Sequence, residues 1–307
     1  MKNLNKNTFM IFILGLLPLL VICQQIEKDT IRLFYLGGQS NMDGYGYNKE
    51  LPKPLKGDFQ NVWIFHGNPA PDENPTGGAG EWDNLKPGHG VGFSSYKGKN
   101  KLSNRFGIEL SFVKKLQEFY PDEKIALIKY SKGGSSIDSL AAWTFGAWEP
   151  DFNGKTGVNQ YDHFLNTIKN ALSDKDIDKN GKQDYLLPMG IIWMQGESDA
   201  DKTEVIATNY YSNLKRLMDL MRASLHTDDL PVVIGKISDS HKDDDGKVWN
   251  FGELVQYAQE KYAKTDKKAA IVRSTRNYNY SDRWHYNSNG YIHLGNEFAK
   301  AVHQLNK

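Results

Sequence analysis

Short apolar runs alternate with amphipathic segments along most of this chain. Runs rich in apolar and β-branched residues predict strands, and apolar residues recurring every three or four positions predict helices. The predicted strands are 31–36, 61–65, 124–130, 189–194, 231–237 and 269–273. The predicted helices have their apolar faces at 106–116, 161–172, 210–225, 251–262 and 291–305. This alternation predicts one α/β domain, 24–307, in which helices cover both faces of a mainly parallel sheet.

The first 23 residues have a different pattern. Lys2 and Lys6 precede an apolar run over 9–23, which predicts a signal peptide cleaved before Gln24. The run is short for a membrane span, so we expect an exported chain, secreted or periplasmic, with no transmembrane segment once mature. A lipid anchor on Cys23 is the alternative. Cleavage after Cys23 would remove the only cysteine and exclude disulfides from the mature protein.

The composition mainly indicates which partners the protein is not expected to have. The 307 residues are 39% hydrophobic and 24% charged, which is typical of a soluble globular domain with a substantial core. The formal net charge is only +1, and loss of the two signal-peptide lysines would bring it to −1. No broad basic surface is therefore expected, and neither nucleic acid nor an anionic membrane surface is a predicted partner.

The first candidate for chemistry is Ser40. The predicted strand 31–36 ends at Gly37 and Gly38, which permit a sharp exit from the sheet and would expose the Ser40 hydroxyl at its carboxyl edge. We interpret Ser40 as a catalytic nucleophile. A serine that only hydrogen-bonds its own turn is the alternative, and the local sequence alone does not separate the two.

A serine nucleophile needs an imidazole base and a carboxylate that orients it. Among the eight histidines, His285 has Asp282 three residues before it, immediately ahead of the last predicted helix. One turn can then present both side chains to the edge of the sheet. The same spacing also arises by chance on protein surfaces, so it becomes informative only together with Ser40.

Four blocks together resemble the SGNH hydrolase superfamily, in particular its carbohydrate acetylesterases related to sialate O-acetylesterase and family 6 acetylxylan esterases. The blocks are GQSNM (38–42), GGS (133–135), WMQGESD (193–199) and DRWHY (282–286). The resemblance implies a three-layer α/β/α sandwich with a flavodoxin-like central sheet. It also implies that Ser40, Asp282 and His285 form a catalytic triad that removes O-acetyl groups from sugars.

The same resemblance implies an oxyanion hole made by the Ser40 amide, a glycine amide of the second block and the Gln195 side chain. Gly134 is preferred over Gly133 as the glycine donor. Many SGNH hydrolases have asparagine where Gln195 stands, and a glutamine amide can donate the same hydrogen bond from one methylene further back. Three further residues are expected to support this edge through hydrogen bonds: Gln39, Asn41 and Glu197.

Aromatic residues suggest where a sugar would stack. The candidates are Trp143, Trp148 and Trp284, with packing in the core as the alternative for each. The segment 43–100 is rich in Gly and Pro and predicts a long ordered loop. Its aromatic residues allow the same two interpretations, and they are Tyr45, Tyr47, Trp63, Trp82 and Phe93.

One motif lies outside these blocks. The segment 176–184 matches several positions of a calcium loop, with ligands predicted from Asp176, Asp178, Asn180, Asp184 and the Lys182 carbonyl. The twelfth position is Leu187 instead of a bidentate acid, and a solvated turn is the alternative. We predict a structural role for calcium here and no cofactor for catalysis.

The leading hypothesis is a serine carbohydrate esterase that releases acetyl groups through an acetyl-serine intermediate. The expected partner is an acetylated carbohydrate. One alternative is an SGNH lipase or lysophospholipase acting on longer acyl chains. The other is a glycan-binding module without catalysis, which would have no need of an intact Ser, Asp and His set.

Overall fold

The computed structural model describes residues 29–307, so the predicted signal peptide and Cys23 lie outside the described residues. The strands are β1 (Asp29–Gly38), β2 (Gly46–Tyr47), β3 (Val62–His66), β4 (Trp82–Asn84), β5 (Ser94–Ser95), β6 (Asn100–Lys101), β7 (Arg105–Phe106), β8 (Ile125–Ser131), β9 (Asp184–Met194), β10 (Val232–Gly235) and β11 (Ala269–Val272). The α-helices are α1 (Ser40–Asp43), α2 (Glu109–Phe119), α3 (Gln160–Ser173), α4 (Glu197–Asp201), α5 (Glu204–Ser224), α6 (Gly252–Thr265) and α7 (Ser288–Leu305). Four short 3₁₀ helices lie at Asn48–Glu50, Lys53–Leu55, Ser139–Ala141 and Ser274–Asn277.

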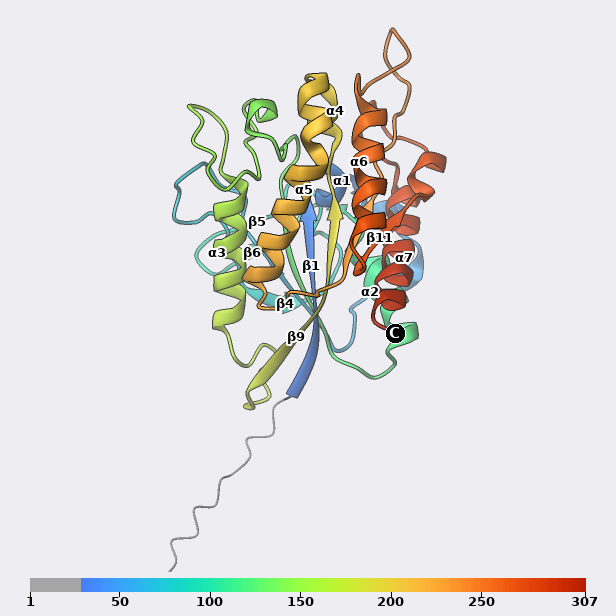
Figure 1. Cartoon of the computed structure of the whole chain (residues 1–307). Coiled ribbons are helices and arrows are strands. Elements are labelled where there is room, and N and C mark those ends of the chain that lie inside the picture. Colours follow the sequence, from blue (N-terminus) through green and yellow to red (C-terminus); the bar gives the residue numbers. More distant parts are fainter. Residues whose placement is uncertain (1–28) are drawn as a thin grey trace, which may run out of the picture.

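The central element is a seven-stranded sheet in the order β11-β10-β9-β1-β8-β3-β4. Figure 1 shows its neighbouring strands β1 and β9 side by side. Every neighbouring pair is parallel except β3 and β4, which are antiparallel. The prediction of a mainly parallel sheet is therefore confirmed. The antiparallel edge strand β4 lies in the segment read from the sequence as loop, because a three-residue strand is too short to show a period of two.

Successive side chains of β1 face opposite sides of the sheet, and each side meets a helix. Phe34 packs edge-on against Phe112 of α2, with ring centroids 5.4 Å apart. Tyr35, the next residue, packs against Phe164 of α3 at 5.0 Å. Helices therefore cover both faces around this central strand. Within residues 29–307, no helix combines the length and the apolar character needed to cross a bilayer.

The register of the central strands brings three polar strand ends to one edge. Gly38 at the end of β1 is paired with Ser131 on β8 and with Met194 on β9. Residues that follow each strand, including Ser40 and Gly134, therefore leave the sheet side by side. Gly38 is required at this junction, because it has φ +142° and an added Cβ would lie 2.0 Å from the Met194 carbonyl oxygen.

Candidate active site

Asp282 and His285 form a pair within one turn that precedes α7. Asp282 Oδ2 lies 2.7 Å from His285 Nδ1, and Asp282 Oδ1 accepts the backbone N–H groups of Trp284 and His285, each at 2.7 Å. Burial alone would raise the pKa of Asp282, but these hydrogen bonds lower it below its ordinary value. The acid is therefore ionised at neutral pH and holds the proton of the imidazole on Nδ1, which leaves Nε2 free to accept a proton.

The imidazole is also held from its face. The ring of Tyr45 is stacked on that of His285, with centroids 3.5 Å apart and planes inclined by 6°. Burial, together with the carboxylates of Asp43 and Asp282, raises the pKa of Tyr45 to about 12, so its ring stays neutral. Tyr45 thus limits the rotation of His285, a role that the sequence did not suggest.

Ser40 lies at the beginning of α1, and it lines the same cleft as His285. The cleft has a volume of about 500 Å³, enough for a small ligand or one end of a larger one. Ser40 is 7% exposed, and no residue of 29–307 forms a hydrogen bond with its hydroxyl. The structure thus brings together the three residues predicted as a triad.

Two backbone N–H groups near the Ser40 hydroxyl are available as hydrogen-bond donors. Within the described part of the chain, the N–H groups of Ser40 and Gly134 have no hydrogen-bond acceptor, and both residues line the cleft. The N–H of Gly133 is already bound to Asp43 Oδ2 at 2.8 Å. Of the two glycines, only Gly134 therefore has a free N–H in the described residues, and the free amides of Ser40 and Gly134 can both stabilise negative charge on a carbonyl oxygen.

Gln195 differs from the prediction. Its Nε2 donates to Asp199 Oδ2 at 2.6 Å, its Oε1 accepts the hydroxyl of Tyr210 at 3.0 Å, and the residue is fully buried. It does not line the cleft. The structure therefore does not present the Gln195 amide to a substrate, because a buried carboxylate at Asp199 already binds it.

Asn41 and Glu197 join the polar strand ends, as predicted. Asn41 Nδ2 donates to Glu197 Oε1 at 2.8 Å and to the Trp284 carbonyl at 3.2 Å. Asn41 Oδ1 accepts the hydroxyl of Tyr291 at 2.8 Å. Burial raises the pKa of Glu197, and the hydrogen bond from Asn41 lowers it in part because it stabilises the ionised carboxylate. Asn41 therefore links α1, which carries Ser40, to the turn that holds His285.

Asp43 was not predicted as a site residue, yet it ties α1 to the loop after β8. Its carboxylate accepts the Ser131 hydroxyl and the Gly133 N–H, and its carbonyl accepts Lys129 Nζ at 2.9 Å. Burial raises the pKa of Asp43. Lys129 is itself fully buried and paired with Glu109 at 3.0 Å. Asp43 lies only three residues after Ser40, which was the available signal for a role in the site. Its hydrogen-bond partners are about 90 residues away in the chain, so the sequence alone did not reveal them.

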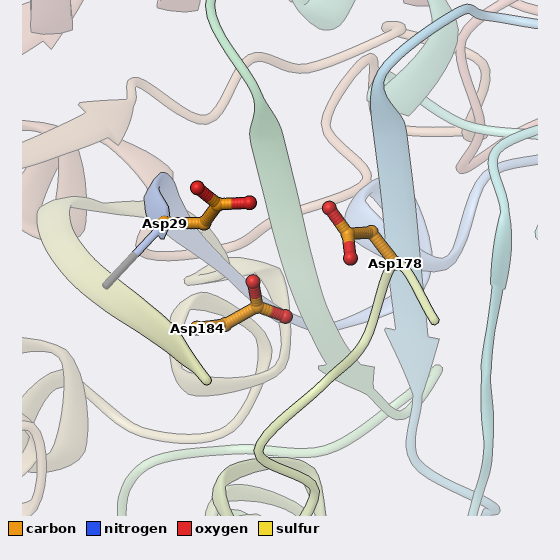
Figure 2. Close-up of side chains that lie close together, drawn as sticks. All are labelled: Asp29, Asp178 and Asp184. Atoms are coloured by element: carbon orange, nitrogen blue, oxygen red, sulfur yellow. The ribbon is translucent and has the colours of Figure 1, made fainter. Parts of the chain in front are cut away.

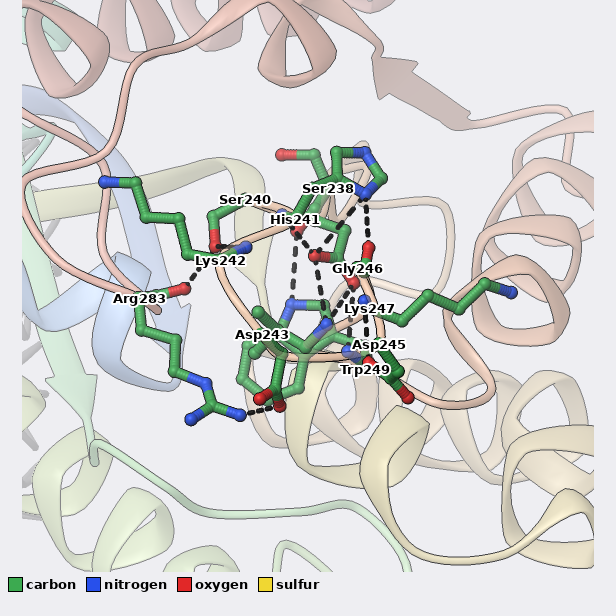
Figure 3. Close-up of polar contacts among 12 residues, drawn as sticks. Ser238, Ser240, His241, Lys242, Asp243, Asp245, Gly246, Lys247, Trp249 and Arg283 are labelled. Atoms are coloured by element: carbon green, nitrogen blue, oxygen red, sulfur yellow. Dashed lines mark hydrogen bonds and ion pairs between the residues drawn. The ribbon is translucent and has the colours of Figure 1, made fainter.

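A loop between β10 and α6 contacts the turn that holds Asp282 and His285, and Figure 3 shows its contacts with Arg283 of that turn. Ser240 Oγ donates to the Arg283 carbonyl at 2.7 Å, and Lys242 Nζ donates to the Asp282 carbonyl at 3.2 Å. Arg283 forms an ion pair with Asp243. The backbone around Asp282 is thus held by several contacts from a segment about 40 residues earlier.

Two of the three predicted stacking residues border the cleft. Trp143 and Trp284 are 65% and 47% exposed and line it together with Phe145. Lys202 Nζ lies 3.1 Å from the centroid of the Trp143 ring. Trp148 is fully buried and donates to Ser135 Oγ at 3.0 Å, so its prediction as a sugar contact is wrong. Its indole belongs to the core.

The predicted calcium loop brings only part of its ligand set together. Carboxylate oxygens of Asp178 and Asp184 lie near Asp29, within 4.8 Å of one another (Figure 2). Lys124 Nζ lies among them, 2.5 Å from Asp178 and 2.8 Å from Asp29. Asp176 instead accepts backbone N–H groups, at 3.0 Å from Asn180 and 2.9 Å from Gly181.

The remaining ligand atoms of this loop are also engaged. Asn180 Oδ1 accepts the Lys182 N–H at 2.8 Å, and Asn180 Nδ2 donates to Asp29. The ammonium group of Lys124 supplies positive charge beside Asp178, one of the residues predicted to bind calcium. Calcium binding by this loop stays a prediction.

The sequence model of the family described as carbohydrate esterase, sialic acid-specific acetylesterase, matches residues 30–304. No curated protein matches the chain. A protein from Arabidopsis thaliana has a similar structure, with a TM-score of 0.62 and 19% identity, over 91% of this chain and 99% of that one.

Two other solved structures are similar. A carbohydrate acetylesterase from Xanthomonas citri has a TM-score of 0.59 and 16% identity, covering 89% of this chain and 56% of that one. A protein named NanS has a TM-score of 0.57 and 16% identity, covering 91% of this chain and 98% of that one. At these identities the likenesses show the fold, and the family match carries the function.

Proposed function

This chain belongs to the carbohydrate esterase family described as sialic acid-specific acetylesterase, and we propose that it removes O-acetyl groups from sugars through an acetyl-serine intermediate. The single observation that carries the mechanism is the Asp282 and His285 pair at 2.7 Å beside Ser40 in one cleft. The fold we propose is the three-layer α/β/α sandwich of the SGNH hydrolases.

In the first half of the reaction, the Ser40 oxygen attacks the acetyl carbonyl carbon while His285 Nε2 takes the hydroxyl proton. The carbonyl oxygen becomes negatively charged, and the free N–H groups of Ser40 and Gly134 donate to it. When the tetrahedral intermediate collapses, the bond to the sugar oxygen breaks and His285 returns the proton to that oxygen. The products are a free sugar hydroxyl and acetyl-Ser40.

In the second half, water attacks acetyl-Ser40 and gives its proton to His285. The same amides stabilise the second tetrahedral intermediate. When it collapses, the bond between the acyl carbon and the Ser40 oxygen breaks, His285 returns the proton to that oxygen, and acetic acid is released. Asp282 stays ionised throughout, consistent with the lowered pKa of its carboxyl group, and stabilises the imidazolium formed in each half.

The rim of the cleft supports a sugar as the group that carries the acetyl ester. Trp143 and Trp284 are exposed there, and aromatic rings can stack on the apolar sides of pyranose rings. Lys132 also lines the cleft and has no ion-pair partner among residues 29–307. It is positioned to favour a carbohydrate that carries a carboxylate.

The test is acetate release from O-acetylated sialic acids and from acetylated xylo-oligosaccharides, each with wild type and Ser40→Ala. We expect release from at least one class, and a loss of at least ~10³-fold in Ser40→Ala with an unchanged melting temperature. Acetate release that survives Ser40→Ala would reject this site. Release only from long-chain acyl esters would instead support a lipase.

We also propose that the protein is exported, on the basis of the N-terminal sequence described above. Mass spectrometry of the mature chain tests this proposal. A first residue of Gln24 supports cleavage by signal peptidase, a diacylglyceryl group on Cys23 supports a lipid anchor, and an intact Met1 contradicts both.

A further inference from the structure

The orientation of the Gln39 carboxamide is fixed by its oxygen. Gln39 Oε1 accepts the backbone N–H groups of Gly196 at 3.4 Å and Ser198 at 3.3 Å, and Nε2 of Gln195 at 3.3 Å. Backbone N–H groups only donate, so the atom facing them must be the oxygen. Nε2 of Gln39 therefore points away from the loop after β9.

This nitrogen has no partner within the described residues. No acceptor in residues 29–307 binds Gln39 Nε2, although the residue is only 3% exposed and lines the cleft beside Ser40. Its backbone is also held, because Gln39 N–H donates to the Met194 carbonyl at 2.9 Å. The chain thus presents a preorganised and unpaired donor next to the nucleophile.

The amide of Gln195 is committed elsewhere. Asp199 is fully buried, and besides Gln195 Nε2 it accepts the backbone N–H groups of Ile137 at 2.9 Å and Asp138 at 2.9 Å. Burial raises the pKa of Asp199 to about 6, and these donors keep it from rising further. Withdrawing Gln195 from Asp199 would leave a buried carboxylate with fewer donors, which is costly.

We propose that the side chain of Gln39 is the third donor to the oxyanion, together with the amides of Ser40 and Gly134. Gln195 is then a positioning residue, which holds the oxygen of Gln39 and the carboxylate of Asp199. This assignment rests on the proposed esterase function and deepens it. Three N–H donors would meet the carbonyl oxygen as it gains charge, which is when such donors contribute most to the rate.

The test compares Gln39→Glu with Gln39→Met on 4-nitrophenyl acetate, with burst kinetics to isolate acylation. Glutamate keeps an oxygen for the three N–H groups and removes only the donor. We expect Gln39→Met to lower the acylation rate by ~10²–10³-fold with little change in KM. Gln39→Glu should lose at least as much at pH 8, because its second oxygen would present negative charge to the oxyanion.

The pH profile separates a catalytic role from a structural one. Relative to wild type, the rate of Gln39→Glu should rise toward acidic pH, because a protonated carboxyl group donates again. Gln39→Glu should also melt at the wild-type temperature. Gln195→Met is the matched comparison, and we expect it to lower the melting temperature and to reduce acylation by less than ~10-fold.

The outcomes are distinguishable. If Gln39→Glu acylates within ~10-fold of wild type at pH 8, Gln39 is not an oxyanion donor. If Gln195→Met loses as much rate as Gln39→Met and keeps its stability, Gln195 is the donor. Should Gln195→Met fail to fold, the two Gln39 variants still decide the assignment. Activity that survives Ser40→Ala would reject the esterase site itself.

Discussion

Replacing Asp282 with asparagine tests the mechanism at one atom. Asparagine can keep Oδ1 as the acceptor for the backbone N–H groups of Trp284 and His285, so the turn should keep its shape. Its Nδ2 would replace the oxygen now 2.7 Å from His285 Nδ1. A donor there favours the tautomer with hydrogen on Nε2, and that tautomer cannot take the proton of Ser40.

The size of the loss follows from the exposure of this acid. An equivalent change at a buried acid lowers kcat by about 10⁴-fold. The Asp282 side chain is 42% exposed, so water can partly replace it and screen its charge. We therefore expect Asp282→Asn to lower kcat by about 10²–10³-fold, which corresponds to about 3–4 kcal/mol in the activation barrier, with little change in KM.

The assay is steady-state hydrolysis of 4-nitrophenyl acetate, with Asp243→Asn as the control. Asp243 forms an ion pair with Arg283, next to Asp282. Its replacement removes this contact between the loop and the turn and leaves the tautomer of His285 unchanged. We expect that control to lose less than ~5-fold. An Asp282→Asn enzyme with more than a third of wild-type kcat would refute the reasoning. An equal loss of kcat in Asp243→Asn would show that the loss comes from a displaced turn and not from the tautomer of His285.

The same variant has a consequence for stability against pH. The pKa of Asp282 is lowered in the folded protein, so its ionised form stabilises the fold at pH values above the unfolded pKa of about 3.9. That contribution is lost as the pH falls through the lower folded value. Melting temperatures of Asp282→Asn should therefore depend less on pH below about pH 4 than those of wild type.

Three further predictions concern substrate, core and loop. Acetyl esters should be hydrolysed faster than butyryl or octanoyl esters, because Phe145 packs over Gly134 and closes that wall of the cleft, whereas a preference for octanoate in the same assay would contradict this. Lys129→Met should destabilise the fold by about 3–5 kcal/mol in urea titrations, since it leaves the buried Glu109 carboxylate without its cation, and a cost below 1 kcal/mol would refute that account. If the loop 176–184 binds calcium, chelation should lower the melting temperature more than it lowers the initial rate, and Asp178→Ala should abolish this difference. An unchanged melting temperature at ~10 mM calcium would show that the loop is a turn whose carboxylates are neutralised by Lys124 and not by calcium.

The features predictable from the sequence are those fixed by local geometry. Apolar periodicity predicted the six parallel strands and the longer amphipathic helices, because burial on a sheet or helix face imposes a regular spacing. The pairing of Asp282 with His285 also follows from local spacing, since three residues close one turn. Paired glycines at the end of β1 predicted a tight exit, and Gly38 adopts a backbone conformation that favours glycine.

Other features depended on tertiary packing. The sequence does not reveal that Asp199 takes the Gln195 amide and leaves the nitrogen of Gln39 free. Nor does it separate Trp148, which is fully buried, from Trp143, which is exposed at the cleft. The physical reason is common to these cases. A polar or aromatic side chain acts through the neighbours that it meets and the water that it loses, and residues far apart in the chain determine both.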